Sequence, residues 1–91
     1  MYWDVVEVRP VAPRELAVRF KDGLCGVLRI DPSFCTGVFD SLRDDRVVET
    51  AQVSDGVVVW PNGLDLAPDT MYREIKRSPE SRYNLCRSPK P

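Results

Sequence analysis

The sequence predicts a single small α+β domain: an antiparallel sheet of about five strands with two or three short helices. Three observations lead to this fold class. Two runs of β-branched and apolar residues are each interrupted by an Asp-Gly pair, a valine-rich segment starts the chain, and a segment with helical spacing follows the second run. With 91 residues, 43% of them apolar, the chain is bounded to one soluble domain.

The N-terminal half predicts a first strand and then a hairpin. Residues 3–8 read WDVVEV and form the first strand, which Arg9 and Pro10 end because proline cannot donate to a sheet ladder. Residues 15–21 alternate apolar and charged side chains with a period of two, and residues 24–30 return after Asp22-Gly23. The two Asp-Gly hairpins and the first strand supply the five strands.

The apolar side chains predict the register of this hairpin. A two-residue loop would place three large apolar residues on the charged face, whereas a three-residue loop ending at Gly23 gathers six on one face. Each large side chain removed from water contributes about 1.5 to 3 kcal/mol, and a cross-strand pair of Glu15 and Arg29 only about 0.2 to 1 kcal/mol. Packing therefore selects the three-residue loop, with Leu16 opposite Leu28.

The second half predicts short helices around a second hairpin. Helical turns are expected over residues 34–42, and Asp44 is expected to cap a helix that runs through Glu49. Residues 50–54 and 57–60 flank Asp55-Gly56, and the second arm, VVVW, is apolar on both faces, which is typical of a central strand. A last helix begins at Pro68, a residue that fits the first helical turn.

Charge divides the chain into a domain and a tail. Residues 1–76 carry nine basic and thirteen acidic side chains, a net charge of −4, whereas residues 77–91 carry four basic and one acidic, a net charge of +3. The second segment is rich in proline and serine, and its apolar side chains are too few to offset the entropy lost when it is ordered. We expect a domain over residues 1–76 and a disordered basic tail over residues 77–91.

Composition excludes several kinds of chemistry. The chain has no histidine, so a Ser-His-Asp triad, a Cys-His pair and any imidazole metal site are excluded. Its three cysteines have no C-x-x-C spacing, which predicts reduced thiols in a cytoplasmic protein. No apolar stretch is long enough to span a membrane, and no signal pattern starts the chain.

The segment WPNGLDLAPD gathers four candidate site residues: Trp60, Asn62, Asp65 and Asp69. The two carboxylates and the amide are the ligand types of Mg²⁺ or Ca²⁺, and two carboxylates are also the parts of an acid and base pair. The other interpretation is structural: Asn62 makes a turn, Asp65 bonds backbone amides, Asp69 complements a helix dipole and Trp60 fills the core. Turn and capping chemistry explains each residue singly, so the structural interpretation is favoured.

Tyr2 and Trp3 form a second candidate site at the N-terminus. Trp and Tyr dominate interface hot spots, so this pair is a candidate anchor for a partner. The alternative is that Trp3 closes the end of a small core. A domain of this size buries only about 60% of its unfolded surface, and a partner contact would add to its stability.

Four segments carry a family resemblance: MYWDVVEVRP at the start, FKDGLxGVL at 20–28, GVFxxLRD at 37–44 and VVWPNGLDLAPDTMY at 58–72. Together they resemble the small bacterial family catalogued as domain of unknown function 2442, over about residues 1–76. The resemblance implies a compact α+β domain, found alone or joined to a helix-turn-helix module, and often encoded beside another small protein as in toxin and antitoxin pairs. It carries over no catalytic residue, and residues 77–91 are too few for a helix-turn-helix.

The function expected from these observations is a non-catalytic protein-binding module, an antitoxin-like member of a small bacterial pair. Its partner would be a small protein or a second copy of the chain, with no cofactor and no membrane contact. The first alternative is nucleic-acid binding through the basic tail with Arg73, Lys76 and Arg77. The second is a metal or enzyme site that uses the carboxylates of Asp65 and Asp69.

Overall fold

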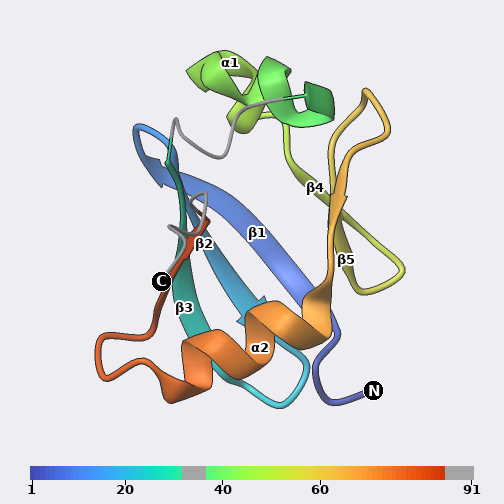
Figure 1. Cartoon of the computed structure of the whole chain (residues 1–91). Helices are drawn as coiled ribbons and strands as arrows, with labels where there is room; N and C mark the ends of the chain where they lie inside the picture. The colour runs from blue at the N-terminus through green and yellow to red at the C-terminus, as the bar shows by residue number, and fades with distance from the viewer. Residues whose placement is uncertain (32–36, 86–91) are drawn as a thin grey trace.

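Two sheets share one hydrophobic core in the computed structural model, which describes residues 1–31 and 37–85 (Figure 1). The first sheet has the order β1-β2-β3-β7, and its strands are β1 (Val5–Ala12), β2 (Glu15–Phe20), β3 (Cys25–Ile30) and β7 (Arg82–Leu85). The second has the order β4-β5-β6, with β4 (Gln52–Ser54), β5 (Val57–Val59) and β6 (Asp65–Leu66). The helical elements are the 3₁₀ helix η2 (Gly37–Arg43) and the α-helices α1 (Asp45–Val48) and α2 (Pro68–Arg77).

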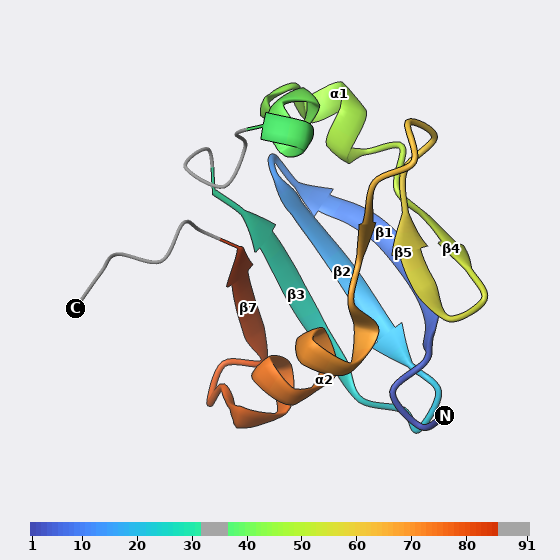
Figure 2. The ribbon, with the colours of Figure 1, turned by 45° about the vertical axis from the view of Figure 1, so that its right-hand side comes forward.

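The α+β class is confirmed, but the single antiparallel sheet is wrong. Neither β4 nor β5 joins the first hairpin; β4 pairs with β5 and β5 with β6, in a separate antiparallel sheet beside β1. The fourth strand of the first sheet is β7, which runs parallel to β3. Figure 2 shows the resulting mixed sheet, with α2 lying across one end of it. Apolar periodicity reports which residues face a core and leaves open which strands are neighbours.

The first hairpin has the predicted three-residue loop. Leu16 lies opposite Leu28 and Glu15 opposite Arg29. The backbone N–H of Phe20 donates to the carbonyl of Leu24 at 2.8 Å, and Gly23 has a φ of +98°. Leu16, Phe20 and Leu28 are buried together, as the packing argument requires.

The first strand is longer than predicted. It continues through Arg9 and Pro10 to Ala12, with irregular register near both ends. Pro10 is tolerated because β1 is the outer strand of its sheet, where a missing N–H leaves no ladder bond unmade. The proline that was predicted to end the strand therefore indicates an edge strand instead.

Residues 82–85 correct the prediction of a disordered tail. They form β7, which pairs with residues 27–30 of β3, and Leu85 is only 6% exposed. A turn after α2 directs the chain back along β3. The Ser78 hydroxyl oxygen stabilises this turn by accepting hydrogen bonds from the N–H groups of Glu80 and Arg82. Pairing with an existing strand needs few apolar side chains, so composition alone underestimated the order here. Residues 86–91 of the predicted tail lie outside the described residues.

The short helices begin where their caps predict. The Asp44 carboxylate accepts from the backbone N–H of Arg46 at 2.9 Å and caps α1, and Pro68 occupies the first turn of α2. The predicted turns over residues 34–42 overlap η2, although residues 32–36 lie outside the described part of the chain. Along α2, Met71 and Ile75 are buried against the sheet.

A glycine on β3 permits the close approach of α2. A Cβ atom on Gly26 would lie 2.5 Å from the Cγ2 atom of Ile75 and 2.7 Å from the backbone oxygen of Ser81. Both distances are shorter than carbon contacts allow, so a larger residue would push the helix or the β7 approach away from the sheet. Gly26 therefore sets the position of α2, and with it the place of the helix face that points to solvent.

Candidate functional site

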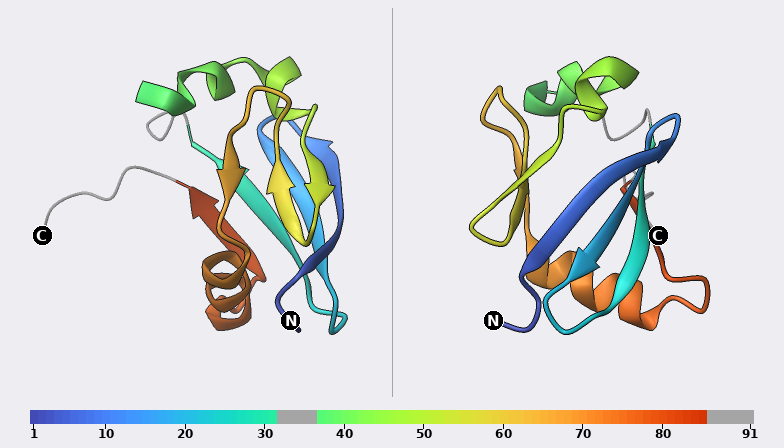
Figure 3. Two further views of the ribbon diagram at one scale, coloured as in Figure 1. Left: turned by 90° about the vertical axis from the view of Figure 1, so that its right-hand side faces the viewer. Right: turned by 180° about the vertical axis from the view of Figure 1, so that it is seen from behind.

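Three of the six residues singled out in the sequence line one groove. Tyr2, Trp3 and Asp69 form part of a hollow of about 360 Å³ between the N-terminal segment and α2. The two views of Figure 3 show the chain start lying beside this helix. Trp60, Asn62 and Asp65 are not among the groove residues.

Backbone bonds hold the N-terminal segment in place. The N–H of Lys21 donates to the carbonyl of Asp4 at 2.8 Å, and the N–H of Val5 donates to the carbonyl of Gly56 at 2.9 Å. The terminal ammonium group bonds the Asp4 carboxylate at 3.1 Å. The segment is thus tied to the loops of both hairpins, which fixes the backbone that carries Tyr2 and Trp3.

A chain of aromatic rings forms one wall of the groove. The Tyr2 ring packs edge-to-face on Trp3 at a centroid distance of 4.8 Å and on Tyr72 at 5.1 Å. Tyr72 in turn contacts the buried Phe20 ring at 5.1 Å. Edge-to-face contacts are favourable for aromatic rings at these separations. Tyr2, which is 57% exposed, is thus connected to the core through the packed rings of Tyr72 and Phe20.

Charged side chains of α2 form the other wall. Asp69, Arg73, Lys76 and Arg77 follow one another at i, i+4, i+7 and i+8, a spacing that places them on one side of the helix. Since Met71 and Ile75 occupy the buried side, the charged stripe faces solvent. Three cations and one carboxylate therefore line the groove.

The partners of these charges differ. The Arg77 guanidinium bonds Glu74 at 3.3 Å, and the Lys76 ammonium lies 5.6 Å from the Tyr72 ring centroid, within cation–π range. Among residues 1–31 and 37–85, neither Arg73 nor Asp69 has a hydrogen-bonding or ion-pair partner for its side chain. The guanidinium of Arg73 is thus available to an anionic ligand.

Tyr72 is held by a hydrogen bond from its hydroxyl group to the Asp22 carboxylate in the hairpin loop. This bond and the loss of surrounding water raise the pKa of Tyr72 to about 12. The same bond, followed by one from the Leu24 N–H, holds the pKa of Asp22 below its usual 3.8. At neutral pH the hydroxyl stays protonated and committed to Asp22, so Tyr72 contributes a fixed ring to the groove.

The other three candidates lie elsewhere and have structural partners or none. Trp60 is 2% exposed, and its indole N–H donates to the carbonyl of Val48 at 3.2 Å. The Asn62 amide group donates to the Ser41 hydroxyl at 2.8 Å, and its oxygen accepts from the Leu64 N–H. Asp65 is exposed on β6, and its carboxylate bonds no amide of the described residues, contrary to the structural interpretation.

The carboxylates predicted for a metal site do not gather. Within the described part of the chain, no group of three His, Cys, Asp or Glu side chains is close enough to hold a metal ion. Asn62 is engaged with Ser41 beside η2, whereas Asp69 lies in the groove on α2. The segment that looked most like a site in sequence is therefore divided between two parts of the fold.

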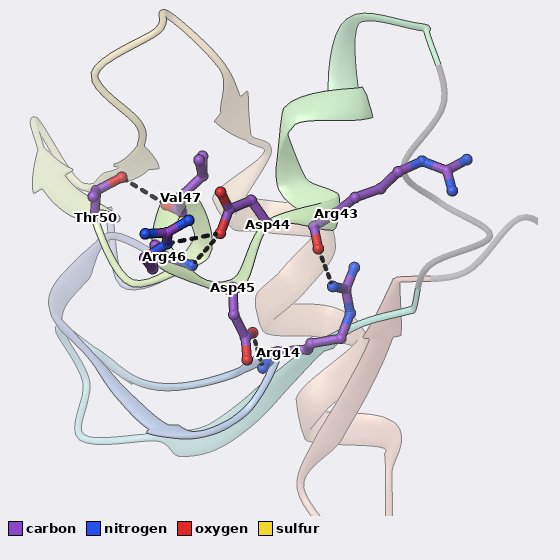
Figure 4. Close-up of polar contacts among 7 residues, drawn as sticks. All are labelled: Arg14, Arg43, Asp44, Asp45, Arg46, Val47 and Thr50. Atoms are coloured by element: carbon purple, nitrogen blue, oxygen red, sulfur yellow. Dashed lines mark hydrogen bonds and ion pairs between the residues drawn. The ribbon is translucent and has the colours of Figure 1, made fainter.

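A second polar cluster, which the sequence did not reveal, surrounds Arg14 (Figure 4). Its guanidinium donates to the carbonyls of Ile30, Leu42 and Arg43 at 2.8 to 3.0 Å, and its backbone N–H donates to Asp45 at 2.8 Å. Arg14 also has a φ of +61°, a region that non-glycine residues rarely adopt. The cluster joins the β1–β2 turn to η2 and α1, which gives it a structural role.

Another hollow of about 360 Å³ lies on the outer face of the first sheet. Its two cations, Arg9 and Arg19, are balanced by two carboxylates, Glu7 and Glu80, and Arg19 is paired with Glu7 at 3.1 Å. No aromatic side chain is among its described lining residues. The groove on α2 therefore offers the more specific chemistry, because it combines fixed rings with an available cation.

These features define a small α+β protein with an aromatic and cationic groove on α2. The chain belongs to the family described as "Protein of unknown function (DUF2442)", whose model matches residues 5–77. The resemblance seen in the sequence is thereby confirmed. The matched span contains α2 and the charged wall of the groove, while Tyr2 and Trp3 precede it.

Two further comparisons returned nothing: no curated protein and no solved structure matches the chain. In the described residues, no helix has both the length and the apolar character needed to cross a membrane.

Proposed function

We propose that this protein is a non-catalytic protein-binding module whose groove on α2 takes a segment of a partner protein. The groove itself carries the proposal: its lining combines a fixed aromatic wall of Tyr2, Trp3 and Tyr72 with the available guanidinium of Arg73. Trp, Tyr and Arg are the residues most enriched at interface hot spots. Because the rings are already held by one another, little side-chain entropy is lost when a partner binds.

Charge favours a protein over a nucleic acid as the partner. The whole chain has a formal net charge of −1, and its Lys and Arg residues are outnumbered by Asp and Glu. Affinity for nucleic acid grows with the number of phosphates neutralised, and the groove offers three cations, one already paired with Glu74. A peptide segment presents fewer charges and more apolar surface, which suits this lining better.

The biological setting of the proposal follows from the family resemblance. A small protein encoded beside this one, as in a toxin and antitoxin pair of the bacterial cytoplasm, is the partner we propose. A second copy of the chain is the alternative protein partner. Both would use the same groove, so the identity of the protein that crosslinks to the groove distinguishes them.

Photocrosslinking in the native host tests the proposal. p-Benzoylphenylalanine is introduced at Tyr2, where it replaces one aromatic ring by another, and in a separate control at Arg46, which is 91% exposed on α1. We expect a protein adduct from position 2 and none from position 46, with the adduct reduced when Arg73→Gln is also present. The purified adduct partner should then bind the unmodified chain, and that binding should be weakened by Tyr2→Ala.

The outcome against the proposal is equally specific. Adducts to nucleic acid from position 2 would favour the alternative in which Arg73, Lys76, Arg77 and the basic tail contact phosphates. Equal protein adducts from positions 2 and 46 would show that the groove is not the contact surface.

A further inference from the structure

The ligand that fits this groove can be described by its chemistry. Arg73 lies in the middle of α2, where the helix dipole gives no reason for a cation; Lys76 and Arg77 lie in the last turn, where it does. A guanidinium holds a carboxylate through two parallel N–H bonds, a geometry that a lysine cannot reproduce. Arg73 therefore fits a planar carboxylate, with the Lys76 ammonium beside it.

The aromatic wall fits a second, apolar side chain. Tyr2 remains 57% exposed although its ring is held between Trp3 and Tyr72 at centroid distances of 4.8 and 5.1 Å. An exposed ring that is already ordered is a platform on which another ring or a large aliphatic side chain can pack. The wall and Arg73 belong to the same hollow, so a single short segment can contact both.

Asp69 gives the groove a direction. It lies in the first turn of α2 and has no partner within the described residues, while the three cations follow toward the end of the helix. A ligand carboxylate is repelled at the Asp69 end and attracted at the other. The backbone N–H groups of a bound segment would supply the donors that Asp69 lacks.

We infer that the groove recognises an acidic-aromatic peptide segment, with a Glu or Asp carboxylate bound by Arg73 and a neighbouring aromatic ring packed on Tyr2 and Trp3. The inference rests on the proposed function and names the ligand chemistry of the same site. An open groove of about 360 Å³ suits a short linear segment.

A titration followed by amide and indole NMR shifts tests this inference with a defined probe. The peptide acetyl-Gly-Glu-Phe-Glu-Gly-amide is compared with its Gln counterpart, in which both acids are replaced, and with its Ala counterpart, in which the ring is removed. We expect the acidic-aromatic peptide to shift the Trp3 indole and the Arg73 amide, and each counterpart to bind about tenfold more weakly. The Trp60 indole, which is buried on Val48, serves as an internal reference that does not shift.

Matched variants of the protein sharpen the result. Arg73→Gln should weaken binding about tenfold, Arg73→Lys should restore only part of it, and Arg46→Gln, which removes a cation far from the groove, should leave it unchanged. An equal loss from Arg46→Gln would reduce the effect to general electrostatics and overturn the inference. The amide spectrum of each variant reports whether it is folded.

Two outcomes separate this inference from the proposed function. If the peptide fails to bind while position 2 still crosslinks to a protein, the ligand chemistry is wrong and the binding module stands. If a short oligothymidylate shifts the same groove resonances more strongly than the peptide does, the ligand is a nucleic acid and both proposals are overturned.

Discussion

The polar residues at the two ends of this molecule have different roles. Around η2 and α1, Arg14 donates to three backbone carbonyls, Asp44 caps a helix and Asn62 bonds Ser41. Around α2 and the N-terminus, Arg73 has no partner in the described residues, and Tyr2 is exposed. These polar groups of the first end complete the fold, while Arg73 and Tyr2 at the second end are available to a ligand.

This difference can be measured, because the two kinds of residue should respond to substitution in opposite ways. A residue that completes the fold changes the free energy of unfolding and leaves ligand binding intact. A residue available to a ligand changes binding and leaves the free energy of unfolding nearly unchanged. Four sets of variants examine this contrast, from the largest expected change in stability to the smallest.

Arg14→Ala is expected to have the largest effect. It removes the charge-assisted hydrogen bonds to the carbonyls of Ile30, Leu42 and Arg43, which connect the β1–β2 turn to β3 and η2. The free energy of unfolding should fall by about 2 to 3 kcal/mol. Urea denaturation measures it, and an effect below about 0.5 kcal/mol would remove the contrast between the two ends.

Arg14→Gly separates the side chain from the backbone. Alanine at this position keeps the strain of a φ of +61°, whereas glycine adopts that region freely. Arg14→Gly should therefore be about 1 kcal/mol less destabilised than Arg14→Ala. Glycine as destabilising as alanine would mean that the guanidinium bonds alone determine the loss.

Gly26→Ala is expected to cost about 2 kcal/mol, because its new methyl group would overlap Ile75 and the Ser81 backbone. Gly23→Ala is the matched control: nothing lies within 4 Å of its added methyl group, and only the strain of a positive φ remains. Since Gly26 positions α2, its substitution should also weaken ligand binding. A larger loss of stability from Gly23→Ala, again by urea denaturation, would contradict this account of the helix position.

Tyr72→Phe tests the bond between the groove and the hairpin loop through its dependence on pH. The pKa of Asp22 is lowered in the folded state, so this contribution is present above pH 3.8 and is lost as the pH falls further. The pKa of Tyr72 is raised to about 12, so its contribution is present below pH 10 and is lost as the pH rises toward 12.

The difference in unfolding free energy between wild type and Tyr72→Phe should accordingly be constant from about pH 4 to pH 10 and decline on both sides. Denaturation curves at a series of pH values measure it. A difference that declines within that window would show that other groups dominate the titration.

Arg73→Ala should have the smallest effect on stability, within about 0.5 kcal/mol of wild type, because its side chain makes no bond in the described structure. It should nevertheless weaken binding of the acidic-aromatic peptide about tenfold. This pair of measurements is the direct opposite of the one expected for Arg14→Ala. A loss of stability without a loss of binding would place Arg73 among the residues that complete the fold.

Local signals in the sequence were sufficient for much of the secondary structure. The register of the first hairpin follows from which side chains must share a face, and the pairing of Leu16 with Leu28 confirms it. The cap at Asp44 and the proline at the start of α2 lie where their chemistry predicts. Each of these features depends on residues within a few positions of one another or on one apolar face.

Long-range arrangement was beyond those signals. Nothing in the alternation of residues 50–60 tells which sheet they join. Residues 82–85 have few apolar side chains, yet they form a strand because they pair with the existing edge of β3. The site was affected in the same way. Tyr2, Trp3 and Asp69 were singled out, but Tyr72 was missed, because its place beside Tyr2 depends on how α2 crosses the sheet.

The sequence by itself determined the turns, the caps, the hairpin register and the absence of imidazole chemistry, since each of these depends on residue type and short-range spacing. Only the tertiary structure decided that Asp69 and Arg73 face an aromatic N-terminus while Asn62 braces η2. The physical reason is that one buried core determines where each helix lies, and the packing of Ile75 over Gly26 decides which polar residues meet.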